Sequence, residues 1–190
     1  MLGILSALAL VLFFALLGGR AAMLHKKGIR AIVFAQTDRS DLLLVPVFLA
    51  LAYTILACAF GLPMPRWLTQ PFWRSATIGW LGLALSAVAL SGFAITLRSF
   101  GDSFRVGIDE IKPDKLVMGG MFAVSRNPIY VCFLLFFIGQ FLVNPNPALA
   151  IVLTLLALAI HRQILREEAF LSVHYGADYA AYRKRVRRYL

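Results

Sequence analysis

Hydrophobic residues form long uninterrupted runs along this chain, rather than recurring at the spacing of a soluble amphipathic helix. Three runs, at 2–18, 42–62 and 78–97, contain no Lys, Arg, Asp, Glu or His. A helix of roughly 20 apolar residues crosses the hydrocarbon of a bilayer, which is about 30 Å thick. Each run is therefore predicted to span a membrane without burying a charge.

A further apolar stretch, 129–160, is interrupted by the sequence NPNP at 144–147, which indicates a tight turn between two helices. Each half is short for a complete span, so the hairpin is either a re-entrant pair or two helices that extend beyond their apolar cores. We favour extension, because Pro128 suits the first turn of one helix and Arg162 can reach the interface from the other.

The predicted fold class is therefore all-α, a polytopic membrane protein of about five transmembrane helices that ends in a helical hairpin. Neither a repeat nor a long linker divides the chain, so we expect a single domain over 1–190. Within it, 1–97 would hold three N-terminal helices, and 98–190 a long loop, the hairpin and a basic tail.

The basic residues are divided unevenly between the segments that separate these runs. Of the 19 Lys and Arg residues, five lie in 20–41, two in 62–77, five in 98–128 and seven in 161–190. With five spans, all but the 62–77 segment share one side, which holds 17 of the 19. The positive-inside rule then predicts an external N-terminus and a cytoplasmic C-terminus.

The net charge of +10 is explained by this distribution. A basic face beside a hydrocarbon slab attracts anionic lipid headgroups, so we expect the lipid bilayer and not a nucleic acid as its partner. We place the chain in a bacterial inner (plasma) membrane. No metal is expected, because Cys58, Cys132 and the three histidines show no metal-ligand spacing.

The segment 98–127 differs from the other connections, because it is long, rich in glycine, mixed in charge and partly apolar. A loop of this length in a compact protein usually folds over a ligand, and its glycines allow close backbone approach. Its apolar content argues against the alternative of a disordered connector. The loop leads into 125–130 at the start of a predicted helix, where free amides and a partial positive charge suit a carboxylate.

The short hairpin turn predicts that the start of one helix lies beside the end of the other. Arg126 would then be near the adjacent Glu167 and Glu168, whose side chains point about 100° apart on a helix, so that one of them faces inward. That carboxylate either pairs with Arg126 as a structural ion pair or holds a cationic ligand. The spacing leaves both interpretations open.

Four pieces in order resemble the C-terminal half of the isoprenylcysteine carboxyl methyltransferases and of the related phospholipid N-methyltransferases. They are LVMGGMF at 116–122, RNPIY at 126–130, the glutamate pair at 167–168 and GADYAAYR at 176–183. The resemblance covers about 98–188, and its specificity lies in the ordered combination. It implies a membrane enzyme that transfers a methyl group from S-adenosylmethionine to a lipid-like or prenylated acceptor, by carboxyl O-methylation or amine N-methylation.

The resemblance also implies site residues in this chain. The cofactor-binding positions would be Asp114, Lys115, Leu116, Val117, Phe122, Asn127, Pro128, Ile129, Tyr130 and Glu167. The acceptor-binding positions would be Arg126, Arg162, Gln163 and Glu168. We assign no catalytic base, and the oligomeric state is left open.

Two positions depart from the family pattern. Asn127 stands where the family usually has His, so this position cannot accept a proton near neutral pH. Gln163 stands where the carboxyl methyltransferases have an Arg, which leaves a carboxylate acceptor without that counter-charge unless Arg162 or Arg166 replaces it. The alternative functions are a small transport component, which the few polar residues in the first three spans disfavour, and a non-enzymatic membrane scaffold.

Overall fold

A computed structural model describes residues 1–28, 44–101 and 116–190. Apart from one single-residue bridge, its regular structure is helical within these ranges. The helices are α1 (Leu2–Lys26), α2 (Leu44–Phe60), α3 (Arg66–Thr69), α4 (Ala76–Phe100), α5 (Pro128–Val143) and α6 (Pro147–Arg185), with a 3₁₀ turn at Gly120–Ala123. The prediction of an all-α polytopic membrane fold is confirmed.

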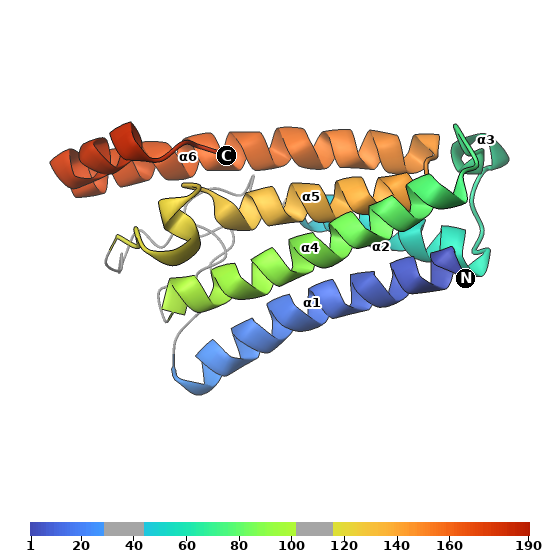
Figure 1. The fold of residues 1–190 in the computed structure, drawn as a ribbon, viewed down its shortest axis with the longest axis horizontal. Helices are drawn as coiled ribbons and strands as arrows, with labels where there is room; N and C mark the ends of the chain where they lie inside the picture. The colour runs from blue at the N-terminus through green and yellow to red at the C-terminus, as the bar shows by residue number, and fades with distance from the viewer. Residues whose placement is uncertain (29–43, 102–115) are drawn as a thin grey trace.

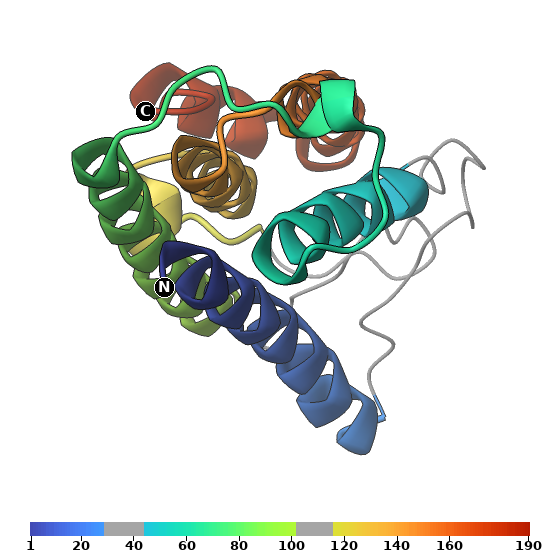
Figure 2. The same ribbon diagram turned by 90° about the vertical axis from the view of Figure 1, so that its right-hand side faces the viewer.

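The long helices lie side by side, so the bundle has two distinct ends (Figure 1). The N-terminus, α3 and the turn between α5 and α6 lie at one end, which we call the turn end. The ends of α1 and α4 and the start of α5 lie at the other, which we call the loop end. Viewed along the bundle, α5 is enclosed by the other helices (Figure 2).

Helix lengths follow the predicted runs with two exceptions. The helices α1 and α4, of 25 residues each, and α6, of 39, are long and apolar enough to cross a membrane. The described part of α2 has only 17 residues and ends at Phe60, because Gly61 adopts φ +68° and closes the helix by donating to the carbonyl of Ala57 at 2.8 Å. In the hairpin, α6 extends beyond its apolar part as we favoured, whereas α5 stops after 16 residues, enclosed by its neighbours.

Aromatic side chains fill the middle of the bundle. Phe13 of α1 is 1% exposed, and its ring is in contact with four phenylalanine rings of neighbouring helices at centroid distances of 4.8–5.5 Å. These rings come from α4 and α5: Phe93, Phe133, Phe136 and Phe137. Edge-to-face and offset contacts of this kind stabilise the packing beyond the area that they bury.

The helices α4 and α5 approach each other closely at two glycines. A Cβ atom on Gly82 would lie 2.5 Å from the carbonyl oxygen of Gly139, and one on Gly139 would lie 2.4 Å from Oγ of Ser86. Small residues at facing positions let transmembrane helices pack backbone to backbone. Both positions therefore require glycine because any side chain would clash with the facing helix, and not because of an unusual backbone conformation.

Beside this contact, four neutral polar side chains form what we call the neutral cluster: Ser6, Ser86, Gln140 and Asn144. The hydroxyl of Ser6 donates to Oε1 of Gln140 at 2.5 Å, and Nε2 of Gln140 donates to Oγ of Ser86 at 3.1 Å. Nδ2 of Asn144 donates to Oγ of Ser6 at 3.1 Å. Since Ser6, Ser86 and Gln140 are fully buried, these bonds join α1, α4 and α5 without contact with water.

The NPNP sequence forms the predicted tight turn, and a glycine reverses the chain at the far end of α6. Oδ1 of Asn146 accepts from the backbone N–H of Leu149 at 2.9 Å, and Pro147 occupies the first helical turn, so the turn caps α6. Near its other end, Gly176 adopts φ +49° and ψ −117°, which kinks the helix. After this kink the chain returns along α6 toward the loop end (Figure 1).

Candidate functional site

A buried carboxylate lies at the loop end, where α6 passes the start of α5. The side chain of Glu168 is 6% exposed, and its Oε1 lies 3.2 Å from Nη2 of Arg126 and accepts from Nδ2 of Asn127 at 3.2 Å. Its Oε2 accepts from Nε and Nη2 of Arg188 at 3.1 and 3.0 Å. We call Arg126, Asn127, Glu168 and Arg188 the charged cluster.

The charged cluster shows which of the two glutamates faces Arg126. Arg126 is brought near the glutamate pair, as predicted, and its ion-pair partner is Glu168. The Arg126 side chain is 8% exposed, so this is a desolvated pair. Hydrogen bonding to Glu168 raises the pKa of Arg188 above its ordinary value, so the cluster holds two cations around one carboxylate.

The second glutamate faces a different set of side chains. Oε1 of Glu167 accepts from the hydroxyl of Tyr130 at 2.5 Å and from Nε2 of Gln163 at 3.0 Å. Arg166 in turn donates to Oε1 of Gln163 at 3.4 Å. The two adjacent carboxylates thus separate as helical geometry requires, with Glu168 in the ion pairs and Glu167 beside the first turn of α5.

The C-terminal residues after the kink complete this end of the molecule. The backbone N–H of Arg126 donates to the carbonyl of Arg187 at 2.9 Å, and Ser125 and Arg187 form the isolated bridge. The carbonyl of Arg188 accepts from Nδ2 of Asn127 at 3.1 Å. Residues 187–188 therefore pair with the segment that leads into α5.

Two tyrosines pack over the charged cluster from the part of α6 beyond Gly176, outside its apolar stretch. Tyr182 donates to the carbonyl of Phe122 at 2.6 Å, whereas the buried hydroxyl of Tyr179 has no partner among the described residues. Burial raises the pKa of each to about 12, so both are neutral hydroxyls near neutral pH. Nε of Arg126 is likewise buried without a described hydrogen-bond partner.

The structure brings together most of the site residues that the sequence suggested. Asn127 and Pro128 are buried at the start of α5, next to the half-buried Ile129 and Tyr130. Phe122 is buried against Phe100, with ring centroids 4.6 Å apart. The other predicted positions differ in exposure: Leu116 and Val117 are half-buried, Gln163 is buried and Arg162 is exposed.

Two predicted cofactor-binding positions, Asp114 and Lys115, lie outside the described residues. In contrast, sequence reasoning missed Arg188 and Tyr179 as members of this site, and it gave Ser125 no role of its own within 125–130. The basic tail was interpreted as a lipid-facing segment or, in the scaffold alternative, as a partner-binding segment, although Gly176, within the GADYAAYR sequence, was a signal that the chain could reverse there.

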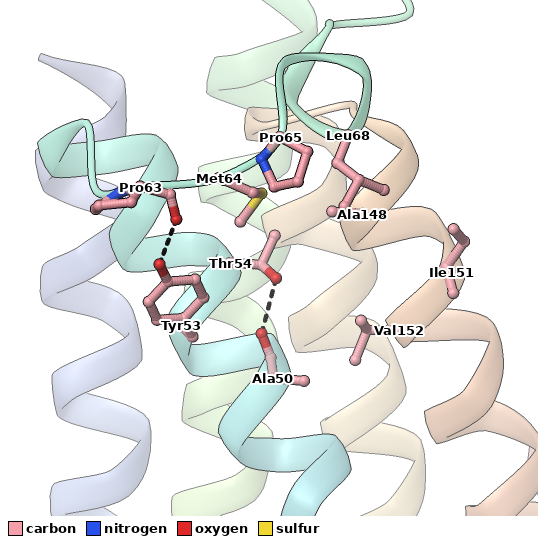
Figure 3. A pocket seen from close by; sticks show the side chains of 10 residues that line it. All are labelled: Ala50, Tyr53, Thr54, Pro63, Met64, Pro65, Leu68, Ala148, Ile151 and Val152. Carbon is pink, nitrogen blue, oxygen red and sulfur yellow. Dashed lines mark hydrogen bonds between the residues drawn. The ribbon is translucent and has the colours of Figure 1, made fainter.

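An apolar pocket of about 310 Å³ lies elsewhere, at the turn end between α2, α3 and α6. Figure 3 shows its lining, which includes Tyr53, Met64, Leu68 and Ile151. Its polar groups bond within the protein, since Thr54 donates to the carbonyl of Ala50 at 2.7 Å and Tyr53 donates to that of Pro63. Along α6 the pocket is about 25 Å from Glu168, so it is separate from the charged cluster.

Comparison with protein families identifies a relationship. The model of the phospholipid methyltransferase family matches residues 77–178, which run from α4 past the start of α5 and Glu168 to beyond Gly176. No curated protein and no solved structure matches the chain. The matched segment covers more than half of the 190 residues and contains Arg126, Asn127 and both glutamates.

Proposed function

The chain belongs to the phospholipid methyltransferase family, and from this premise we propose that it transfers a methyl group from S-adenosylmethionine to a lipid-like acceptor at the loop end of the bundle. The acceptor atom would be an amine nitrogen or a carboxylate oxygen. The observation that carries the proposal is that the family match spans the start of α5 and the polar part of α6, where the charged cluster and Glu167 lie together.

The chemistry of this end suits the cofactor. Asn127 is the N-cap residue of α5, and its side chain makes no capping bond within the described structure, so the partial positive charge at this helix end suits a methionyl carboxylate. Glu167 and Tyr130 suit an ammonium group or ribose hydroxyls. When bound, S-adenosylmethionine supplies an electrophilic methyl group on a sulfonium.

We propose the cofactor-binding set that the sequence suggested: Asp114, Lys115, Leu116, Val117, Phe122, Asn127, Pro128, Ile129, Tyr130 and Glu167. These residues would act by holding the donor in line with the acceptor, because displacement at a methyl group needs alignment rather than a covalent nucleophile. The acceptor would be contacted by Arg126, Arg162, Gln163 and Glu168.

The acceptor determines whether a proton must be removed. A carboxylate is already ionised, whereas an ammonium group must lose a proton before it attacks. With a pKa of about 12, the Tyr179 hydroxyl is not a base near neutral pH, and Asn127 cannot accept a proton. We assign no base to this site and propose that an amine acceptor enters it already deprotonated, with the loss of its proton to water.

We also propose that the loop end faces the cytoplasm. Within the described residues this end carries the basic ends of α1, α4 and α6, and the chain holds 17 of its 19 Lys and Arg residues in segments assigned to this side. A reporter fused after Leu190 should be active in the cytoplasm. Activity only outside the cytoplasm would overturn this orientation.

The proposed activity is tested by titrating the detergent-purified protein with S-adenosylmethionine in a calorimeter. The protein is then placed in vesicles with methyl-labelled cofactor and either phosphatidylethanolamine or phosphatidylglycerol, and a farnesylated cysteine is tested in parallel. We expect cofactor binding, and label in the amine lipid or in the prenylated carboxylate but not in phosphatidylglycerol. Absence of binding would favour the scaffold interpretation.

A further inference from the structure

Beyond the family match, which ends at residue 178, the last residues of the chain reach the charged cluster. We propose that Arg188 is a positioning residue for the methyl-transfer site: it holds Glu168 and Asn127 so that the Asn127 side chain does not cap α5 at the helix end where the cofactor carboxylate would bind. This inference rests on the proposed function, because it specifies how a segment outside the matched region maintains the same site.

Three consecutive C-terminal residues are fixed by polar contacts to different parts of the loop end. The carbonyl of Arg187 accepts from the N–H of Arg126 at 2.9 Å. The guanidinium of Arg188 donates two bonds to Oε2 of Glu168 at 3.0 and 3.1 Å. The hydroxyl of Tyr189 lies 2.5 Å from Nδ1 of His161. Such contacts by adjacent residues indicate a docked segment rather than a free basic tail.

The contacts of Asn127 show what this docking does. Asn at the N-cap ordinarily accepts from an amide of the first helical turn. Here Nδ2 of Asn127 instead donates to Oε1 of Glu168 at 3.2 Å and to the carbonyl of Arg188 at 3.1 Å. The side-chain amide is thereby held away from the helix, in agreement with the missing capping bond in the described structure.

The second carboxylate oxygen explains why the guanidinium is needed as well as the carbonyl, because Oε2 of Glu168 accepts from Arg188. Glu168 and Arg126 are 6% and 8% exposed, so each depends on its partners for compensation. Arg188 engages the carboxylate oxygen that Arg126 does not, which leaves Oε1 for Arg126 and Asn127. Without Arg188, Oε2 would compete for these donors, and the carbonyl that holds Asn127 would be released.

The test uses full-length Arg188→Met, Arg188→Lys and a matched control, Arg185→Met, which removes an equal charge from an exposed position three residues earlier. Each variant is titrated with S-adenosylmethionine well below its unfolding temperature. We expect affinity to fall about tenfold in Arg188→Met, as for the loss of one charge-assisted hydrogen bond. Arg188→Lys should recover part of this loss, and Arg185→Met should bind as the unchanged protein does.

Hydrogen exchange without cofactor gives a second, independent readout. The amide of Arg126 should exchange faster in Arg188→Met than in the unchanged protein and in Arg185→Met, because it loses the Arg187 carbonyl. Unchanged affinity in Arg188→Met, even with lower thermal stability, would overturn the inference, and if that variant does not fold, unchanged affinity in Arg188→Lys would do so.

The two proposals fail in different ways. If the unchanged protein does not bind S-adenosylmethionine, the proposed function is wrong and the positioning role falls with it, while the exchange of the Arg126 amide still tests whether the C-terminal residues are docked. If the unchanged protein binds and Arg188→Met binds equally well, the function stands and the role of Arg188 is wrong.

Discussion

The neutral cluster and the charged cluster both join segments that are far apart in the sequence, but they differ in charge and in completeness. The neutral cluster links α1, α4 and α5 through amide and hydroxyl groups, and its buried side-chain atoms all have partners. The charged cluster surrounds one carboxylate with two guanidinium groups, and Nε of Arg126 and the nearby hydroxyl of Tyr179 have no described partner.

This difference separates two uses of polar residues in a membrane protein. In hydrocarbon, a polar group without a partner is costly, so a cluster that satisfies all its own bonds is suited to holding helices together. Charged groups are far more costly there, and they are found where a ligand or water is accessible. We therefore expect substitutions in the neutral cluster to change stability but not cofactor binding, and substitutions at the loop end to change both.

The largest expected effect on stability is that of Glu168→Gln. The substitution keeps the shape of the side chain but leaves Arg126, which is 8% exposed, and Arg188 without their counter-charge. Breaking a buried pair on one side costs about 3–5 kcal/mol, which thermal unfolding in detergent should show as a clear fall in stability. Glu167→Gln is the matched control and should destabilise less. Equal stability of both variants would contradict the assignment of Glu168 as the carboxylate of the charged cluster.

A smaller effect is expected where α4 meets α5 beside the neutral cluster. In Gly82→Ala the new Cβ would lie 2.5 Å from the carbonyl oxygen of Gly139, so the two helices must move apart. Overpacking of this kind costs about 1–3 kcal/mol. The control is Gly19→Ala, where a Cβ meets nothing within 4 Å. If thermal unfolding shows the same stability for both variants, the close approach of α4 and α5 is wrong.

The smallest effect is expected for Gln140→Leu. This change removes the hydrogen bonds to Ser6 and Ser86 and replaces the amide side chain with an apolar one of similar size. Hydrogen bonds between transmembrane helices contribute about 0.6 kcal/mol each on average. The loss of two such bonds should therefore lower the free energy of unfolding by about 1 kcal/mol. Affinity for S-adenosylmethionine should not change. A loss of affinity would show that the neutral cluster affects the site.

Much of the fold was predictable because its signals are local. Uninterrupted apolar runs predicted α1 and α4, and the NPNP sequence predicted the turn before α6. The closeness of Arg126 to the glutamate pair was predicted because a short turn places the start of α5 beside α6. These features depend on bilayer thickness, on turn chemistry and on helix geometry, all of which can be evaluated from a sequence.

The rest depends on contacts between distant residues. The contact of the tail with Glu168 requires the reversal at Gly176, and a single glycine signals that a reversal is possible but not where the following residues dock. The contact of Ser6 with Gln140 likewise joins residues 134 positions apart. Which glutamate faces Arg126 depends on the rotation of α6 about its axis, and this rotation is set by the packing of α6 against the other helices.

The central claim is that the loop end binds S-adenosylmethionine and that the neutral cluster does not take part. The most direct measurement is calorimetric titration of the unchanged protein, Glu167→Gln and Gln140→Leu in the same detergent, each below its unfolding temperature. Loss of a charge-assisted hydrogen bond of about 1.5–3 kcal/mol predicts about tenfold to hundredfold weaker binding for Glu167→Gln, with the affinity of Gln140→Leu unchanged. Equal affinity in all three proteins would remove Glu167 from the site, and no binding by the unchanged protein would contradict the account as a whole.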